Sequence, residues 1–136
     1  SGGDRRMIFT RGIYIDGEYF NIPIVSIKRN ADFLDKFAER VETGELQREL
    51  IGVYFNYTMS VGKSSSFPDG VYKRFWDKVT EPVPFHIISL PSDPGYYEYT
   101  AYISSVSDEY EKITQDSADY KGFTCKFTAK EPARRP

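Results

Sequence analysis

The chain has 136 residues, 40% of them hydrophobic, and a formal net charge of −2 at neutral pH, which fits one domain and disfavours a nucleic-acid partner. Cys125 is the only cysteine, which excludes an intrachain disulfide and any zinc or redox site built from several cysteines, and suits a reducing cytoplasm. The sequence contains no apolar run of about 18 residues, so we expect neither a transmembrane span nor a signal peptide.

The aromatic content is high, with 11 Tyr and 10 Phe, and is typical of a β-rich chain because flat rings pack well across a pleated surface. We expect residues 1–6 to be a cloning scar and a disordered N-terminus, residues 7–130 to form a single β-rich domain, and residues 131–136 to be an unstructured tail.

The first clear element is a hairpin. Asp16-Gly17 separates Ile13–Ile15 from Glu18–Phe20, and a type I′ turn favours this pair because both central residues need a positive φ. Residues 21–27 continue in an extended conformation. Pro23 lacks the N–H that a central strand needs, so this segment is predicted at a sheet edge or a bulge.

Residues 28–49 differ in kind from the rest of the chain. They hold eleven charged residues, and a few apolar ones stand at spacings that could form one stripe of a helix: Phe33, Leu34, Phe37 and Val41. Two interpretations remain open: a short helix after an Asp32 cap, or a long excursion from the sheet whose apolar residues contact a neighbouring subunit. Thr43-Gly44 is the predicted turn within it.

The stretch 46–62 contains the strongest period-two pattern. From Ile51 to Val61 every second residue is large and apolar or aromatic, and the alternate residues are smaller and mostly polar. This pattern predicts a long strand with one face on the core, including Phe55 and Met59. Gly62-Lys63-Ser64 is not a phosphate loop, because Tyr57 stands where that motif needs its first glycine.

A helix is predicted over about 67–80. Ser66 and Asp69 resemble a capping box, and Pro82 ends the run. One face collects five apolar residues that we expect to pack on the sheet: Val71, Tyr72, Phe75, Trp76 and Val79.

The last part of the chain predicts strands at 83–90, 96–106 and 120–129, with a charged loop over 108–119. Phe123 and Phe127 are assigned to the core, and Cys125 reads as a small core residue. His86, the only histidine, has no nucleophile motif beside it and is interpreted as structural. We therefore predict no catalytic, cofactor-binding or metal-binding residue, and no enzymatic activity.

Together these elements predict an α+β, mainly β fold: an antiparallel β-sandwich or open barrel with one flanking α-helix. The segments RGIYIDGEYFNIPIVSIKR, GELQRELIGVYFNYTMSVG, YKRFWDKVTEPVPFHIISLP and YKGFTCKFTAKEPARRP resemble short hypothetical proteins of prophages and tailed phages of Gram-positive bacteria. The order of elements is similar to the tail-tube fold of phage tube and distal tail proteins. That resemblance implies that 28–49 is a loop reaching a neighbouring subunit.

The resemblance implies a phage tail structural protein that acts by ring or tube assembly, in a tube, distal tail, adaptor or tail-completion role. Its partners would be further copies of itself in a homo-oligomeric ring and other tail proteins, and it would be made in the host cytoplasm and end in the virion tail. The alternative is a non-enzymatic module that binds carbohydrate or protein through a tyrosine-rich sheet face. The candidate interface residues are Phe33, Leu34, Phe37, Arg40, Val41, Tyr97, Tyr99 and Tyr102.

Overall fold

The computed structural model describes residues 12–40, 42 and 44–136, and within them the chain forms seven strands, one α-helix and one 3-10 turn. The strands are β1 (Ile13–Ile15), β2 (Glu18–Phe20), β3 (Ile24–Arg40), β4 (Leu46–Val61), β5 (His86–Pro91), β6 (Tyr96–Ile113) and β7 (Ala118–Ala129). The 3-10 turn spans Ser64–Ser66 and α1 spans Val71–Val79.

All strands belong to one open antiparallel sheet with the order β2-β1-β5-β6-β7-β4-β3. The predicted fold class, mainly β with one helix and an open sheet, is confirmed. The Asp16-Gly17 turn is also confirmed, with φ values of 53° and 84°. Pro23 directly precedes β3, which is an edge strand with a register shift between Ile24 and Ser26, as the missing N–H predicts.

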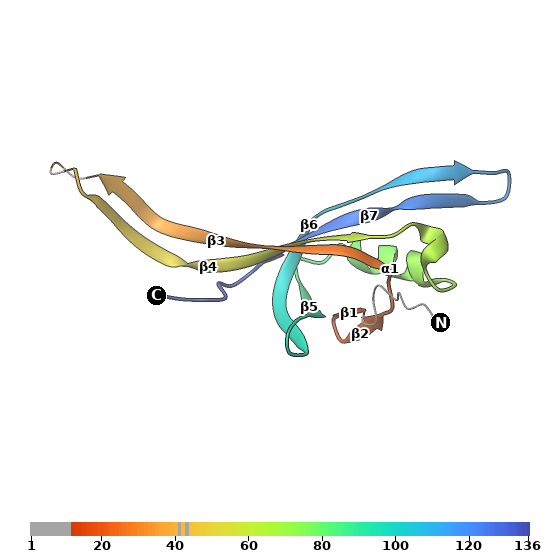
Figure 1. Cartoon of the computed structure of the whole chain (residues 1–136), viewed down its shortest axis with the longest axis horizontal. Coiled ribbons are helices and arrows are strands. Elements are labelled where there is room, and N and C mark those ends of the chain that lie inside the picture. Colours follow the sequence, from red (N-terminus) through yellow and green to blue (C-terminus); the bar gives the residue numbers. More distant parts are fainter. Residues whose placement is uncertain (1–11, 41, 43) are drawn as a thin grey trace.

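The molecule is elongated, with a central body and a long hairpin at each end. Figure 1 shows β3 and β4 running together beyond the body on one side, and β6 and β7 extending on the other side, near α1. β6 links the two parts of the sheet, because its first residues pair with β5 and the rest pair with β7.

The core lies in the body, between α1 and the sheet. The ring of Phe75 is fully buried and contacts Phe20 and Phe123 at centroid distances of 5.2 and 5.4 Å. Met59, Phe75, Phe123 and Phe127 are buried as predicted. Phe55 is only partly buried, so that prediction is wrong: its face was assigned correctly, but β4 leaves the body near this residue and nothing covers it fully.

The helix is shorter than predicted and begins differently. It spans nine residues, its N-cap is Gly70 with φ 77°, and no side chain caps it. The capping box is therefore wrong: the Ser66 hydroxyl instead donates a hydrogen bond to the Lys63 carbonyl at 2.6 Å. The predicted face is confirmed, since Phe75 and Val79 are buried and the other three apolar residues pack partly buried against the core.

The described part of residues 28–49 is neither a helix nor an irregular loop. Residues of β3 pair with β4 from Ile24↔Val61 out to Arg40↔Leu46, so this segment is a long two-stranded ribbon. We call residues 31–55 the arm. The apolar spacing of Phe33, Leu34 and Phe37 fits a helical stripe, but the alternating pattern of β4 offers a pairing edge that satisfies the backbone of β3.

Two further predictions, for the segments 108–119 and 131–136, are wrong because strand pairing extends into both segments. The segment 108–119 is not a loop: β6 and β7 continue through it to a tight connection, in which the Thr114 N–H donates to the Ser117 carbonyl at 2.8 Å. The charged residues of this segment indicate that both faces of the hairpin are exposed, and they do not indicate whether its backbone is a strand or a loop. Residues 131–136 are not simply an unstructured tail, since Arg134 forms an antiparallel bridge with Val53 of the arm.

Gly52 makes this bridge possible. A Cβ at position 52 would lie 2.6 Å from the Pro132 Cβ and 2.8 Å from the Arg134 carbonyl oxygen, both too close for a side chain. The segment 132–134 therefore rests directly on the backbone of β4.

The position of Phe75 predicts a large stability cost on truncation. Phe75→Ala leaves a cavity between α1, β2 and β7, so the free energy of unfolding should fall by about 3–5 kcal/mol. Phe55→Ala should cost less, roughly 1–2 kcal/mol, because that side chain is only partly buried. Urea titrations of both variants check the order; an equal cost would mean that Phe55 is buried in solution.

Candidate functional site

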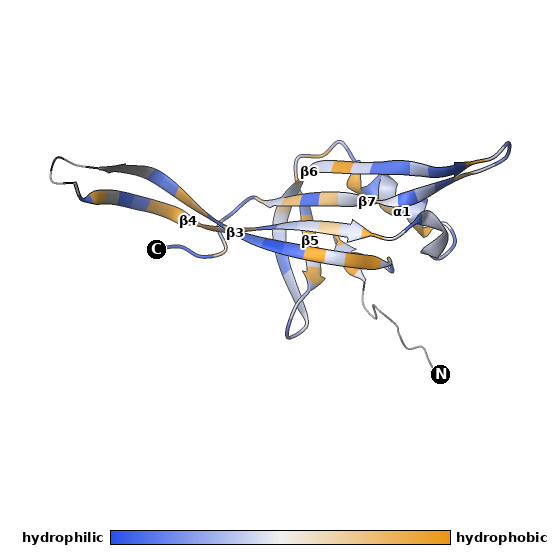
Figure 2. Cartoon of the chain, turned by 45° about the horizontal axis from the view of Figure 1, so that its top comes forward, coloured by the Kyte–Doolittle hydropathy of each residue, from blue (hydrophilic) through white to orange (hydrophobic). Residues whose placement is uncertain are grey.

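The arm exposes apolar side chains on a ribbon that is one layer thick. Phe33 is 59% exposed and Leu34 is 48% exposed, and further along the arm Leu46 and Ile51 are also exposed. Figure 2 shows hydrophobic and hydrophilic bands following one another along both strands of the arm. An isolated two-stranded hairpin is marginally stable in water, so a covering partner would stabilise this ribbon.

A hollow of about 300 Å³ lies at the base of the arm. It brings together three of the candidate interface residues, Phe33 and Leu34 from β3 and Tyr102 from β6. The remaining lining residues are Asp32, Tyr54, Asn56, Thr128 and Ala129. Four strands therefore contribute to this hollow, which only the fold assembles.

Polar contacts hold the hollow in place. The Asn56 amide donates to the Asp32 carboxylate at 2.6 Å, and its carbonyl oxygen accepts from the Ala129 N–H at 2.8 Å. Asn56 thus ties the arm to the end of β7. Farther out, the Arg48 guanidinium donates to the Asp35 carboxylate at 2.6 Å and lies 5.8 Å from the centre of the Phe33 ring.

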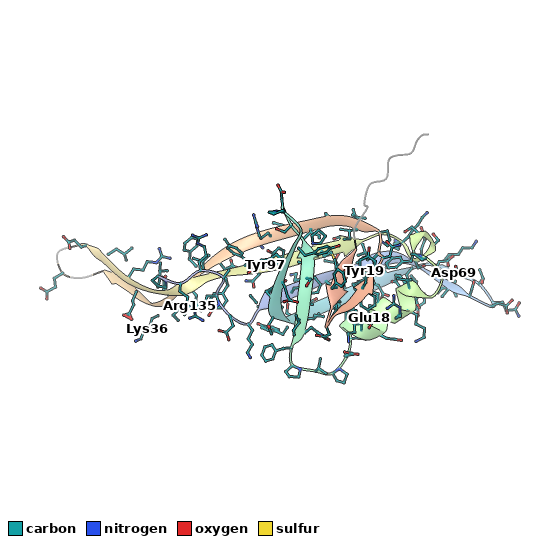
Figure 3. All side chains as sticks on the ribbon, turned by 90° about the horizontal axis from the view of Figure 1, so that it is seen from below. Glu18, Tyr19, Lys36, Asp69, Tyr97 and Arg135 are labelled. Atoms are coloured by element: carbon teal, nitrogen blue, oxygen red, sulfur yellow. The ribbon has the colours of Figure 1, made fainter. Side chains whose placement is uncertain are left out.

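Tyr97 and Tyr99 lie elsewhere, on the face of β6 that packs toward the core. Their rings stack at 5.4 Å, and the Tyr57 ring lies 5.3 Å from that of Tyr99. Burial raises the pKa of the Tyr99 phenol, and its buried hydroxyl has no partner among the described residues. Figure 3 labels Tyr97 where β6 passes close to the β3–β4 ribbon. The tyrosines of β6 therefore divide between two faces.

The other candidate interface residues are less defined. Phe37 and Arg40 belong to β3, beyond the part of the arm whose side chains the structure describes. Val41 and Thr43 lie outside the described residues.

Sequence reasoning missed a pocket of about 510 Å³ between α1 and the β6–β7 hairpin. Its lining residues are Tyr72, Lys73, Trp76, Asp77, Asp108, Tyr110 and Tyr120. Three of these seven residues lie in the segment 108–120, most of which was predicted as a loop. The available signal was the occurrence of two tyrosines within a strongly acidic stretch.

The described residues include one group able to hold a cation: Asp16, Glu81 and His86. The Lys78 ammonium already lies between the carboxylates, 3.3 Å from Asp16 and 3.4 Å from Glu81. His86 is 3% exposed and places Nδ1 2.7 Å from the Asp16 carboxylate. Because an ionised carboxylate only accepts, Nδ1 carries the proton. A metal ion would have to displace Lys78, so the arrangement fits an ion-pair network that fastens the first hairpin to α1 and β5.

Cys125 is fully buried, and burial raises the pKa of its thiol. The thiolate is therefore disfavoured, and the interpretation of this residue as part of the core is confirmed.

Comparison with known proteins adds no assignment: no family model matches the chain, and no curated protein matches it. In the described part of the chain, no helix has the length and apolar character needed to cross a membrane.

The Asp16 network predicts a pH-dependent loss of stability. Burial alone would raise the pKa of Asp16, but hydrogen bonds from the Ile87 N–H, His86 and Lys78 outweigh it and lower the pKa below 3.8. Asp16→Asn keeps the positive φ of the turn and removes the charge, and should cost about 1–2 kcal/mol at pH 7.

A carboxylate with a lowered folded-state pKa stabilises the protein above its unfolded-state pKa, and this contribution disappears as the pH falls through the folded-state value. The gap between the wild type and Asp16→Asn should therefore be constant from about pH 5 to 7 and close below about pH 4. Denaturation at several pH values measures it. A gap that persists in acid would show that the Asp16 charge does not stabilise the fold.

Proposed function

We propose that this protein is a structural component of a phage or prophage tail and that it acts by assembling into a ring or tube without catalysis. The observation that carries the proposal is the arm. It projects from a well-packed body and exposes apolar residues such as Phe33 and Leu34, while the segment 132–134 covers β4 near Gly52. Exposed apolar surface of this kind marks a protein interaction site.

The backbone of the arm is also available to a partner. β4 pairs with β7 only from Tyr57 to Ser60, and the described residues offer one further bridge, at Val53. β3 is one of the two edge strands of the sheet. A strand from another molecule can extend such an edge, with main-chain hydrogen bonds supplying affinity and side-chain hollows supplying specificity.

The shape of the molecule favours a contact between different surfaces. The arm and the β6–β7 hairpin extend in opposite directions and carry different residues. When the arm of one copy meets another surface of the next copy, the contact repeats, and it closes into a ring or grows into a tube. The sequence resemblance to prophage and tailed-phage proteins supports the same role.

Shortening the arm tests the proposal. Asp35 and Leu50 are register partners, so residues 36–49 can be replaced by Asn-Gly, which restores a two-residue hairpin without shifting the register. The shortened protein should keep its thermal midpoint within a few degrees, because the deleted residues lie beyond the core. Wild-type protein should sediment as assemblies and appear as rings or tubes in negative stain, and the shortened protein should remain monomeric.

A point variant provides a matched comparison. Phe33→Glu places a charge beside the hollow and should raise the dissociation constant of assembly by about 10- to 30-fold. Val25→Glu is the control, since Val25 is also exposed on β3 but lies outside the hollow. Equal assembly by all four proteins, or a wild type that stays monomeric at every concentration, would rule out the proposed role of the arm.

The binding module is the second candidate. It is favoured by a hollow of about 520 Å³ where Tyr57 and Tyr97 meet Arg29 and Asp93, since rings and charged groups together suit a polar ligand with an apolar face. A monomeric wild type whose binding of a glycan or peptide is abolished by Tyr97→Ala would support this candidate over assembly.

A further inference from the structure

The pocket between α1 and the β6–β7 hairpin combines aromatic faces with carboxylates. Tyr120 stacks on Tyr72 with ring centroids 5.2 Å apart and 12° between the planes, and the Tyr110 ring lies 4.8 Å from that of Tyr120 at a tilt of 48°. Trp76 lines the same pocket from α1. Negative π-faces arranged in this way attract a cation with apolar or planar surface.

The charges of the pocket favour a cation as well. Lys73 pairs with Asp77 at 2.9 Å, which neutralises that carboxylate. Asp108 accepts a hydrogen bond from the Tyr72 hydroxyl at 2.9 Å, and no ion pair to it occurs among the described residues. Burial and this neighbouring carboxylate raise the pKa of Tyr72, so its phenol stays neutral and donates. Within the described part of the chain, Asp108 is thus a carboxylate without a cationic partner in a pocket lined by four aromatic side chains.

The two ends of the molecule differ in charge. The segment 108–119 carries five acidic residues and one basic residue, whereas 126–136 carries four basic residues and one acidic residue. Arg134 is exposed, and its side chain forms no ion pair in the described part of the chain, whereas Arg135 pairs with Glu131 at 3.2 Å. Two main-chain hydrogen bonds to Val53 hold Arg134 at the arm side, so its side chain is presented on an ordered backbone.

Arg134 does not reach the pocket of its own chain. In Figure 1 the end marked C lies on the arm side, whereas α1 and the β6–β7 hairpin lie on the opposite side. Figure 3 separates the labelled Arg135 and Asp69, which precedes α1, in the same way. Any contact between the basic segment and the acidic pocket is therefore a contact between two molecules.

We propose that the pocket formed by Tyr72, Trp76, Asp108, Tyr110 and Tyr120 binds the guanidinium group of Arg134 from a second copy of this chain. The contact joins the α1 end of one copy to the arm end of the next. A guanidinium fits better than an ammonium, because its plane stacks on the rings while its N–H groups donate to Asp108. The inference rests on the proposed assembly and names a second contact within it, apart from the hollow at the base of the arm.

A peptide experiment tests the pocket without assembly. Trp76 is the only tryptophan, so its fluorescence reports on the pocket directly. The probe is a peptide with residues 130–136, KEPARRP, titrated into the arm-shortened protein. It should change the emission of Trp76 saturably, and replacing Arg134 of the peptide by citrulline, which is neutral and nearly isosteric, should weaken binding about tenfold or more.

Charge reversal tests the same contact in the full chain. Asp108→Arg and Arg134→Asp should each raise the dissociation constant of assembly about tenfold or more, and the two together should restore assembly. The matched controls are Asp116→Arg, on the same hairpin but outside the pocket, and Arg135→Asp, on the neighbouring residue. Sedimentation velocity measures all five against wild type, with circular dichroism confirming that each is folded.

The outcomes separate the pocket from the proposed function. If wild type assembles, charge reversal has no effect and the peptide does not bind, the pocket inference is overturned and the assembly role stands. If wild type stays monomeric while the peptide binds in a manner that depends on Arg134 and Asp108, the pocket inference stands and the assembly role fails. Equal binding of the citrulline peptide, or a response of Trp76 to neutral sugars alone, overturns the cation assignment.

Discussion

Among the described residues, the β3–β4 ribbon joins the rest of the sheet through four residue pairs, Tyr57 to Ser60 of β4 with Thr124 to Phe127 of β7. On the body side of this junction both edges of β4 are paired, with β3 and with β7, and Met59 and Val61 enter the core. On the other side β7 has turned away, so the ribbon continues without a neighbour except at Val53. The short junction therefore creates the arm, its exposed apolar residues and the edge on which the segment 132–134 rests.

The limited strand pairing also gives the molecule two different ends. β6 and β7 extend beyond the body at the α1 end just as β3 and β4 do at the other, and each hairpin is only partly covered, by α1 in the first case and by the segment 132–134 in the second. One end carries the apolar hollow and the basic segment, and the other carries the aromatic, acidic pocket. In the proposed assembly these two unlike ends would meet in a repeated head-to-tail contact, which closes into a ring or grows into a tube.

Sequence patterns predicted the structure best where an element has a regular hydrophobic period and packs one face against the core. The Asp16-Gly17 turn, the buried positions Met59, Phe123 and Phe127, and the apolar face of α1 could all be predicted, because turn chemistry and periodicity act over a few neighbouring residues. Prediction failed in the two hairpins. The residues around Phe33 and Leu34 left a helix and an excursion from the sheet equally open, and the residues from Asp108 to Asp119 were predicted as a loop. Neither β3 in the arm nor the end of the β6–β7 hairpin has a buried face that would impose alternation.

For the candidate sites, too, the sequence indicated single residues, whereas the fold decided which of them lie together. Phe33, Leu34 and Tyr102 were each recognised as unusual in the sequence, but their meeting in one hollow depends on four strands separated by up to about a hundred residues of chain. The pairing of Asp108 with Tyr72, and the isolation of Arg134 at the far end, carried no signal at all. By itself the sequence determined the fold class, the first hairpin, most of the core and the unusual character of 28–49, since hydrophobic periodicity and turn residues encode them locally. Only the tertiary structure decided that 28–49 is a β-ribbon, where the core ends along β4 and which side chains share a pocket, because these depend on which strands find partners and how far the pairing extends.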